Sequence, residues 1–336
     1  MLKNPRVSDR CASLVLQRRF CTGCKKKPTM ALVLLGGGPI GRAVIRKASS
    51  KSLPIVGFAD SGGAINSSGP IDPEWLIERK QESSTPIGIL STRILPLHKK
   101  IILVDCTASD SAEHIDLLLK AVDNGASVVL ANKHPVAGDQ LLFDKLAPRT
   151  RYESAAGACT PFVVALRRLI DAGERVTRIR GCFSGTLGAV STWIERDGES
   201  LADAVERASL AGLTEPDPQE DLSGADVARK AVILARTAGW AMSWDDVDLS
   251  PFDETAADLA HPRYVASVDR DSAVVGLENI DDPNDPLHHL SGTDNAIAIY
   301  TSDVYRDSPL MIRGAGAGAN ATALGVIADV VEVMRA

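Results

Sequence analysis

The densest group of side chains that could do chemistry lies between Glu215 and Lys230. Carboxylates at high density either form a solvated acidic patch or converge on a cation. A lysine among them is a candidate acid–base group, because burial and neighbouring charges set the protonation state of an amine. Lys230 stands at the end of a run of five carboxylates that fall within twelve residues: Glu215, Asp217, Glu220, Asp221 and Asp226.

A helix is expected to carry both Asp226 and Lys230. Ser223 is its predicted N-cap, and Asp226 completes a pattern like a capping box. An apolar stripe follows at Val227, Ala231, Leu234 and Ala235. Residues four apart lie on one helix face, so the carboxylate and the amine are expected to meet. The alternative is an ordinary exposed ion pair worth about 0.3–0.5 kcal/mol.

A second group of residues, from Ala31 to Ser49, has the pattern of a strand, a dinucleotide-binding turn and a helix. The apolar run Ala31–Leu35 leads into a glycine-rich turn, and Arg42–Ser49 continues with helical character. Glycines at such a turn permit a tight bend, close approach to a pyrophosphate and close packing of helix on strand. Free amides at the start of the helix then face the phosphates. The predicted cofactor contacts in this turn are Gly36, Gly38, Pro39, Ile40 and Gly41.

Asp60 bears on which dinucleotide binds. It ends the apolar run Leu53–Ala59, at the distance from Gly41 where a strand-end carboxylate binds the ribose hydroxyls of NAD. The same charge repels a 2′-phosphate, and Ser61-Gly62-Gly63 supplies no basic residue to offset it. The sequence therefore favours NAD slightly over NADP. The alternative is that Asp60 is a solvated acid at a strand end.

Short apolar runs alternate with stretches of helical periodicity, which is typical of a parallel sheet covered by helices. Further strands are expected at Ile101–Val104 and Ser127–Leu130. Residues just beyond them, Thr107, Ser109 and Lys133, are predicted cofactor contacts. We expect a Rossmann-type, doubly wound α/β domain over residues 30–150.

A second, α+β domain for substrate binding and dimerisation is expected over residues 151–312. Residues 313–336 are expected to return to the first domain and to bring Gly316 to the cofactor. Periodicity predicts strands near 176–183, 264–268, 273–278, 296–301 and 309–313. It predicts helices near 161–172, 187–196, 201–211 and 224–239.

Composition limits the classes of partner. The chain has 336 residues, of which 45% are hydrophobic and 24% charged, as in a globular protein of about two domains. Its net charge of −6 argues against a nucleic-acid partner. No apolar run approaches the roughly 18 to 20 residues that cross a bilayer. We therefore expect neither a nucleic-acid partner nor a membrane span.

Residues 1–29 differ from the rest, because they hold eight basic side chains against one acid. This leader is either a transit peptide for an organelle, or a disordered or artefactual stretch before a true start at Met30. The expected location is the cytoplasm, or a plastid or mitochondrion if the leader is a transit peptide. Cys21 and Cys24 have the spacing of half a zinc site, but nothing in the sequence completes it.

Several ordered blocks, from about Val33 to Asp329, resemble the homoserine dehydrogenase family. The segment from Thr214 to Lys230 is similar to the family signature. The chain ends soon after the last residues that resemble the dehydrogenase, so neither a kinase half nor a C-terminal regulatory domain is expected. The other blocks are Ala131-Asn132-Lys133-x-Pro135, Tyr152-Glu153 with Gly157-Ala158, Gly181-x-Phe183-Ser184-Gly185-Thr186-Leu187, and Gly314-x-Gly316-Ala317-Gly318 with Thr322-Ala323.

The resemblance implies reversible reduction of L-aspartate 4-semialdehyde to L-homoserine by NAD(P)H, in the route to threonine and methionine. Lys230 matches the proposed acid–base lysine of the family, and Lys133 matches a second lysine near the reacting carbonyl. Asp226 completes the expected catalytic group. Glu215, Asp221 and Asp226 match acids that hold the substrate, chiefly its amino group, or support the lysines.

The resemblance also implies a sodium ion and a homodimer. Glu153, with backbone groups of Ala156, Ala158 and Thr160, matches a loop that binds a monovalent cation, and oxygen ligands suit a hard cation. Glu153 forming an ordinary salt bridge is the alternative. The homodimer interface is expected to include the sheet of the second domain.

Two other functions remain open: a non-catalytic NAD(P)-binding sensor or scaffold, and another amino-acid dehydrogenase on the same fold. Loss of catalysis is disfavoured by the joint presence of Lys133, Glu215, Asp221, Asp226 and Lys230.

Overall fold

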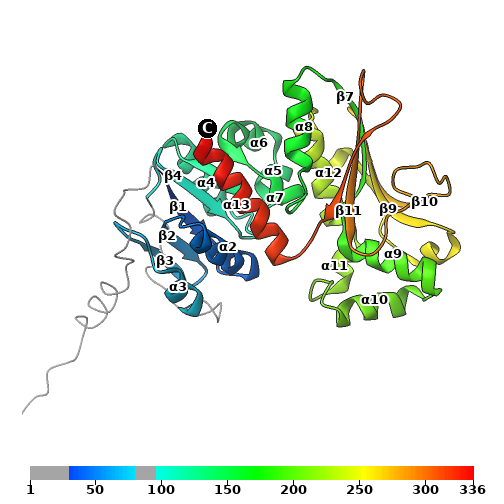
Figure 1. Cartoon of the computed structure of the whole chain (residues 1–336), viewed down its shortest axis with the longest axis horizontal. Coiled ribbons are helices and arrows are strands. Elements are labelled where there is room, and N and C mark those ends of the chain that lie inside the picture. Colours follow the sequence, from blue (N-terminus) through cyan, green and yellow to red (C-terminus); the bar gives the residue numbers. More distant parts are fainter. Residues whose placement is uncertain (1–29, 80–95) are drawn as a thin grey trace, which may run out of the picture.

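A computed structural model describes residues 30–79 and 96–336, which form two six-stranded sheets with helices around them (Figure 1). The predicted leader, with Cys21 and Cys24, lies outside these residues. Within the described ranges, no helix is both long and apolar enough to span a bilayer.

The first sheet has the strand order β3-β2-β1-β4-β5-β6. All neighbouring strands are parallel except β2 and β3, so the expected Rossmann-type sheet is confirmed but is not parallel throughout. The chain turns back after Asp60, whose carboxylate accepts the Gly62 N–H, and β3 becomes an antiparallel edge strand. The strands are β1 (Ala31–Leu35), β2 (Ile55–Asp60), β3 (Gly63–Asn66), β4 (Ile101–Asp105), β5 (Ser127–Leu130) and β6 (Thr150–Arg151).

Helices cover both faces of the first sheet, because alternate residues of β1 belong to different apolar clusters. Leu32 and Leu34 pack with α2 (Pro39–Ser50) and α13 (Ala319–Arg335), whereas Val33 and Leu35 pack with α4 (Ala112–Asp123). The other helices here are α3 (Pro73–Arg79), α5 (His134–Ala137), α6 (Gln140–Leu146) and the 3-10 turn η2 (Ala147–Arg149).

The second sheet has the order β12-β11-β7-β9-β10-β8 and is antiparallel except between β10 and β8. The five predicted strands are confirmed to within two residues, whereas the three-residue β8 was not predicted. The strands are β7 (Val176–Cys182), β8 (Val247–Leu249), β9 (Pro262–Val268), β10 (Ala273–Asn279), β11 (Asp294–Thr301) and β12 (Leu310–Ala315).

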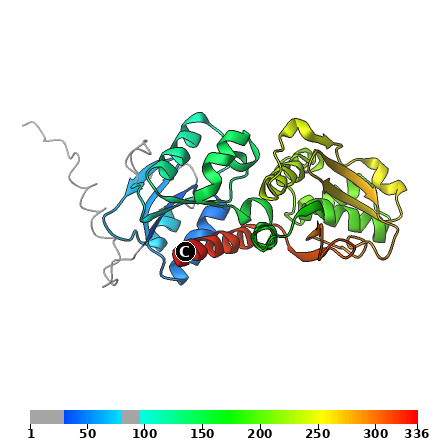
Figure 2. The same cartoon turned by 90° about the horizontal axis from the view of Figure 1, so that it is seen from above.

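Two helices, α8 (Phe162–Asp171) and α12 (Ala225–Thr237), lie between the sheets (Figure 1). α12 contacts β9 on one side and α5 on the other. The last helix, α13, runs from the second sheet back along the first and packs against α2 (Figure 2). The remaining helices are α7 (Glu153–Ala156), α9 (Gly185–Asp197), α10 (Leu201–Leu210), α11 (Pro218–Leu222), and the 3-10 turns η3 (Trp244–Asp246) and η4 (Glu254–Asp258).

The start of α12 differs from the prediction. Gly224, not Ser223, is the N-cap, and its φ of 71° is left-handed. A Cβ at this position would lie 1.8 Å from the hydroxyl oxygen of Tyr264 on β9, so close packing on the sheet requires glycine. The prediction that Asp226 caps this helix is therefore wrong, and its carboxylate is free for other partners.

Candidate active site

Three charged side chains from two distant parts of the chain meet at the amino end of α12. Lys133 Nζ lies 3.0 Å from Asp226 Oδ1, and Lys230 Nζ lies 2.8 Å from Asp226 Oδ2. Lys230 also donates a hydrogen bond of 2.6 Å to the backbone oxygen of Phe183. Because Lys133 follows β5 directly, the cluster forms where the carboxyl edge of the first sheet faces α12.

Lys230 is the most enclosed of the three groups. Its side chain is 9% exposed, against 28% for Lys133 and 46% for Asp226. Burial disfavours the charged amine and lowers the pKa of Lys230; the charge of Lys133 adds to this lowering, while Asp226 opposes it. Lys230 is therefore better able to exchange a proton near neutral pH than a lysine in water.

The carboxylate of Asp226 responds in the opposite direction. Its partial removal from water tends to raise its pKa, but the adjacent charges of Lys230 and Lys133 outweigh this effect and hold the pKa well below its usual range. Asp226 therefore stays ionised and bridges two cations. The negative charge at this position also opposes the lowering of the Lys230 pKa.

The other four acids of the predicted cluster have separate environments. The Asp221 carboxylate accepts the backbone N–H of Glu215 at 2.8 Å, and its charge raises the pKa of Lys230. Asp217 caps α11, while Glu215 and Glu220 are exposed. The structure thus brings Asp221, Asp226 and Lys230 together, but among the described residues the Glu215 carboxylate contacts neither lysine.

The glycine turn between β1 and α2 fits a pyrophosphate. A Cβ at Gly36 would lie 2.9 Å from the backbone of Cys106, and one at Gly41 would lie 1.9 Å from the Gly36 oxygen. Both positions are therefore closed to larger residues. A Cβ at Gly38 would meet nothing within 4 Å, so this side of the turn is open. No side chain caps α2, and Pro39 occupies its first turn, which leaves helical amides to face an anion.

The loop with Thr107 and Ser109 is held by the buried carboxylate of Asp105, at the end of β4. Asp105 accepts hydrogen bonds from Thr107 Oγ1 at 2.7 Å, His114 Nε2 at 2.7 Å and Asn132 Nδ2 at 3.0 Å. Asn132 Nδ2 also donates to the backbone oxygen of Ser109 at 2.8 Å. This network connects the ends of β4 and β5 next to Lys133.

Sequence reasoning missed Asp105, His114 and Asn132 as part of the site. Asp105 ends β4, and Asn132 lies two residues after the end of the neighbouring parallel strand β5. The carboxyl ends of parallel strands meet at one edge of a sheet, so the sequence positions of these two residues could have indicated that they lie together. His114 lies within α4, nine residues after Asp105, and nothing in the sequence indicates that its ring turns back to the carboxylate.

Gly316 lies in the turn that precedes α13, packed against Asn295. A Cβ at Gly316 would lie 1.8 Å from Asn295 Nδ2. The backbone oxygen of the adjacent Ala315 accepts a hydrogen bond of 3.0 Å from Thr160 Oγ1. This turn is therefore fixed to the loop that follows α7.

Among the described residues Glu153 forms no salt bridge, but its carboxylate has hydrogen-bond partners. Its carboxylate accepts the backbone N–H groups that open α8, those of Phe162, Val163 and Val164, at 2.8–3.0 Å. Burial raises its pKa, although these hydrogen bonds oppose the shift. The residues predicted with it are also engaged, since Ala158 O accepts from Ser154 Oγ and Thr160 O accepts from the Phe162 N–H.

The backbone oxygens of Ala158 and Thr160 each have a second lone pair, so a cation at this loop would share these oxygens with the hydrogen bonds described. Over residues 30–79 and 96–336, no group of three or more His, Cys, Asp and Glu side chains could hold a metal ion.

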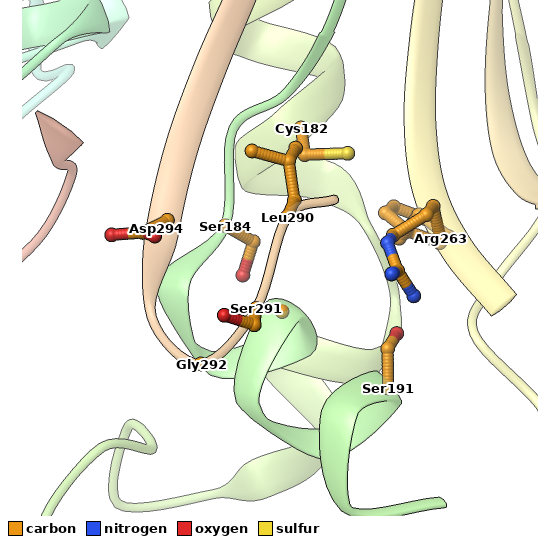
Figure 3. A pocket seen from close by; sticks show the side chains of 10 residues that line it. Cys182, Ser184, Ser191, Arg263, Leu290, Ser291, Gly292 and Asp294 are labelled. Carbon is orange, nitrogen blue, oxygen red and sulfur yellow. The ribbon is translucent and has the colours of Figure 1, made fainter. Parts of the chain in front are cut away.

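A small polar cavity lies beside the second sheet, lined by Ser184, Ser191 and Arg263 among others (Figure 3). Its volume is about 10 Å³, which is room for one water molecule and not for an amino acid or a dinucleotide. Ser184 also caps α9 by accepting the Leu187 N–H. Ser184 therefore has a structural role at this cavity, apart from the lysine cluster.

Comparisons with known proteins agree on one family. A family model described as homoserine dehydrogenase matches residues 161–331. The homoserine dehydrogenase of Emericella nidulans is 33% identical over 78% of this chain and 84% of its own length. The chloroplastic bifunctional aspartokinase/homoserine dehydrogenase 1 of Zea mays is also 33% identical, over 91% of this chain. The chain spans only 38% of the length of that plant relative.

Solved structures give the same result. A hyperthermophilic archaeal homoserine dehydrogenase in complex with NADPH superimposes with a TM-score of 0.76 at 26% identity, covering 91% of this chain and 98% of that one. The homoserine dehydrogenase of Thermoplasma acidophilum has a TM-score of 0.77 at 26% identity, covering 91% and 99%. The likeness therefore extends over both sheets.

Proposed function

The chain belongs to the homoserine dehydrogenase family, and we propose that it interconverts L-homoserine and L-aspartate 4-semialdehyde with a nicotinamide dinucleotide. The observation that carries this proposal is the buried amine of Lys230, paired with Asp226 and facing Lys133 at the carboxyl edge of the first sheet. The open glycine turn at the same edge supports binding of the dinucleotide there.

Lys230 is the proposed acid–base group at the oxygen of the substrate. A reduced nicotinamide bound near the glycine turn would supply hydride to the aldehyde carbon. The ammonium group of Lys230 would stabilise the negative charge that develops on the aldehyde oxygen and would donate a proton to it. In the reverse direction the neutral amine accepts the hydroxyl proton. Lys133 adds a second positive charge, and Asp226 holds both amines in place.

The acids around the lysines are suited to an amino-acid substrate. Asp221 and Asp226 place negative charge close to Lys230, where it can attract the ammonium group of homoserine. Glu215 is exposed on the loop before α11, and we propose that it contributes to this attraction only when substrate is bound. A non-catalytic sensor has no need of a buried amine whose pKa is lowered, so we favour the enzyme.

The direct test is absorbance of the reduced nicotinamide with homoserine as substrate, run once with NAD and once with NADP. We expect turnover that depends on homoserine and falls strongly with other hydroxy amino acids. Equal turnover with serine or threonine would instead favour another amino-acid dehydrogenase, and no turnover with any of them would overturn the proposal.

The choice of cofactor is proposed to depend on Asp60, which stays at the end of β2 beside the expected ribose. Asp60→Ala should raise the KM for NAD by about tenfold, because a hydrogen bond to a charged group is lost, and change the KM for NADP less. Equal losses for the two cofactors would contradict a role for Asp60 in discrimination.

Two finer proposals concern assembly and ions. A homodimer through the second sheet is tested by sedimentation. A sodium ion at the loop of Glu153, Ala156, Ala158 and Thr160 is tested by replacing sodium with choline in the assay; unchanged kinetics would count against it.

A further inference from the structure

Arg236 joins the two elements that carry the lysines. It lies on α12 six residues after Lys230, and only 4% of it is exposed. Its Nη1 donates to the backbone oxygen of Val136 at 3.0 Å, and its Nη2 to that of Gly138 at 2.7 Å. These two carbonyls belong to the end of α5, the short helix that begins directly after Lys133.

The guanidinium of Arg236 is held by carbonyl oxygens and not by an ion pair. Its Nε donates to the backbone oxygen of Met242 at 2.8 Å, and within the described part of the chain no carboxylate lies in salt-bridge contact with it. Burial lowers its pKa, and the more distant Asp139 and Asp144 oppose this effect. A buried charge with only carbonyl partners contributes little to stability. The arrangement of its three hydrogen bonds therefore points to a role other than stabilising the fold.

The other end of α5 is fixed independently. Asn132 Oδ1 accepts the backbone N–H of His134 at 3.1 Å, and its amide nitrogen donates to Asp105. The backbone around Lys133 is thus tied to the first sheet at its amino-terminal side. At its carboxy-terminal side, among residues 30–79 and 96–336, the side-chain hydrogen bonds that join α5 to α12 come from the guanidinium of Arg236.

We propose that Arg236 is a positioning residue that sets the distance between Lys133 and the Asp226–Lys230 pair. This inference rests on the proposed function. Lys133 reaches Asp226 at 3.0 Å only if α5 and α12 keep their present separation. The planar fork of arginine reaches two carbonyls on α5 at once, which the single ammonium of lysine cannot do. A displacement of about 1 Å at a reacting group can reduce a rate about 100-fold.

The test compares Arg236→Lys and Arg236→Ala with a matched control, Arg263→Ala. Arg263 is equally buried, and it donates to the backbone oxygens of Pro262 and His288 as well as to Glu195, but it lies on β9 beside the small cavity. Removing it takes away a buried guanidinium without touching α5. Both Arg236 variants should lower kcat by about 10- to 100-fold, with the Kd for NADPH, measured by fluorescence, changed less than about threefold.

Two further readouts separate positioning from general instability. Hydrogen exchange of the amides at 136–139 should accelerate in the Arg236 variants but not in Arg263→Ala. The limb of the pH–rate profile that reports Lys230 should move to higher pH, because Lys133 no longer lies close enough to lower that pKa.

Chemical rescue provides a third readout. Arg236 lines a groove of about 760 Å³ among α6, α8 and α12, together with Phe143, Tyr152 and Thr237. A guanidinium ion can enter from this groove, so low concentrations of guanidinium should restore part of the kcat of Arg236→Ala, and an equal concentration of sodium should not.

The possible outcomes are distinct. If the wild-type protein does not oxidise homoserine, the proposed function fails, and the exchange measurement still tests the link between Arg236 and α5. If the wild type is active but the Arg236 variants match Arg263→Ala in kcat, exchange and pH profile, the positioning role is wrong. If Arg236→Ala does not fold, Arg236→Lys decides the question by its kcat, its hydrogen exchange and its pH profile.

Discussion

At the scale of single residues, one carboxylate between two amines defines the site. Asp226 accepts from both Lys133 and Lys230, so neither amine is an unpaired buried charge. The pairing of Asp226 with Lys230 could be predicted, because four residues of helix bring their side chains together. The position of Lys133 beside this pair could not be derived from spacing, because it depends on how α5 packs against α12.

The proposed role of Lys230 predicts a pH dependence. In the proposed oxidation of homoserine, Lys230 accepts the hydroxyl proton and must therefore be neutral, and burial lowers its pKa below the ordinary lysine value of 10.5. We expect kcat/KM for homoserine to rise with pH along a limb that lies below this value. A profile from about pH 6 to 11 measures it.

Lys230→Arg is the matched variant for this profile, because arginine keeps the charge and does not deprotonate in this range. The rising limb should disappear, with activity reduced at every pH. A wild-type limb at or above 10.5, or the same limb in Lys230→Arg, would assign the titration to another group.

At the scale of elements, a buried pair of acids joins three helices. The Asp329 carboxylate on α13 accepts the backbone N–H of Glu153 at 3.0 Å, and the Glu153 side chain in turn holds the start of α8. Burial, followed by the charge of Glu153, raises the pKa of Asp329 to about 7. Between about pH 4 and pH 7, the Asp329 carboxyl is therefore mostly protonated in the folded protein and mostly ionised in the unfolded chain.

This shift predicts that stability falls as pH rises. A carboxyl whose folded pKa is raised contributes stability at low pH, and that contribution is lost between about 4 and 7. Relative to Asp329→Asn, which keeps the oxygen acceptor without the charge, the wild type should lose on the order of 2 kcal/mol between pH 5 and pH 8. Urea unfolding at both pH values measures the difference.

Glu332→Gln is a useful comparison, because Glu332 is an exposed acid on the same helix, paired with Arg151, and its charge contributes a smaller part of the raised Asp329 pKa. This variant should keep most of the wild-type pH dependence, with a slightly smaller loss. Parallel pH dependences for Asp329→Asn and the wild type would show that the buried carboxyl does not titrate in this range.

Most regular elements could be predicted from periodicity, and the failures have separate causes. The predicted strands of the second sheet and the helices at 162–171 and 225–237 are found, because apolar spacing reflects which face is buried. The cap of α12 was misplaced because Gly224 is required by a contact with Tyr264, forty residues away in sequence. The edge strand β3 was missed because four residues carry too little pattern.

At the scale of the whole molecule, the site exists only where the two sheets face each other. The first sheet supplies the glycine turn and Lys133, and α12, packed on the second sheet, supplies Asp226 and Lys230. The sequence motifs predicted which part of the chain carries each of these residues, and their joint role at a substrate stays a prediction. The contacts between α12 and α5, such as the hydrogen bonds from Arg236, are made to backbone carbonyls. Such contacts leave no pattern in the sequence that could predict them.

The measurement that bears most directly on the central claim is turnover of Lys230→Ala with homoserine, alongside its Kd for NADPH. Lys230 is proposed to act on the substrate oxygen and not on the dinucleotide. The variant should therefore lose about 10²- to 10⁴-fold in kcat while binding NADPH as the wild type does. A folded Lys230→Ala protein that turns over within about threefold of the wild type would contradict the assignment of this amine as the acid–base group.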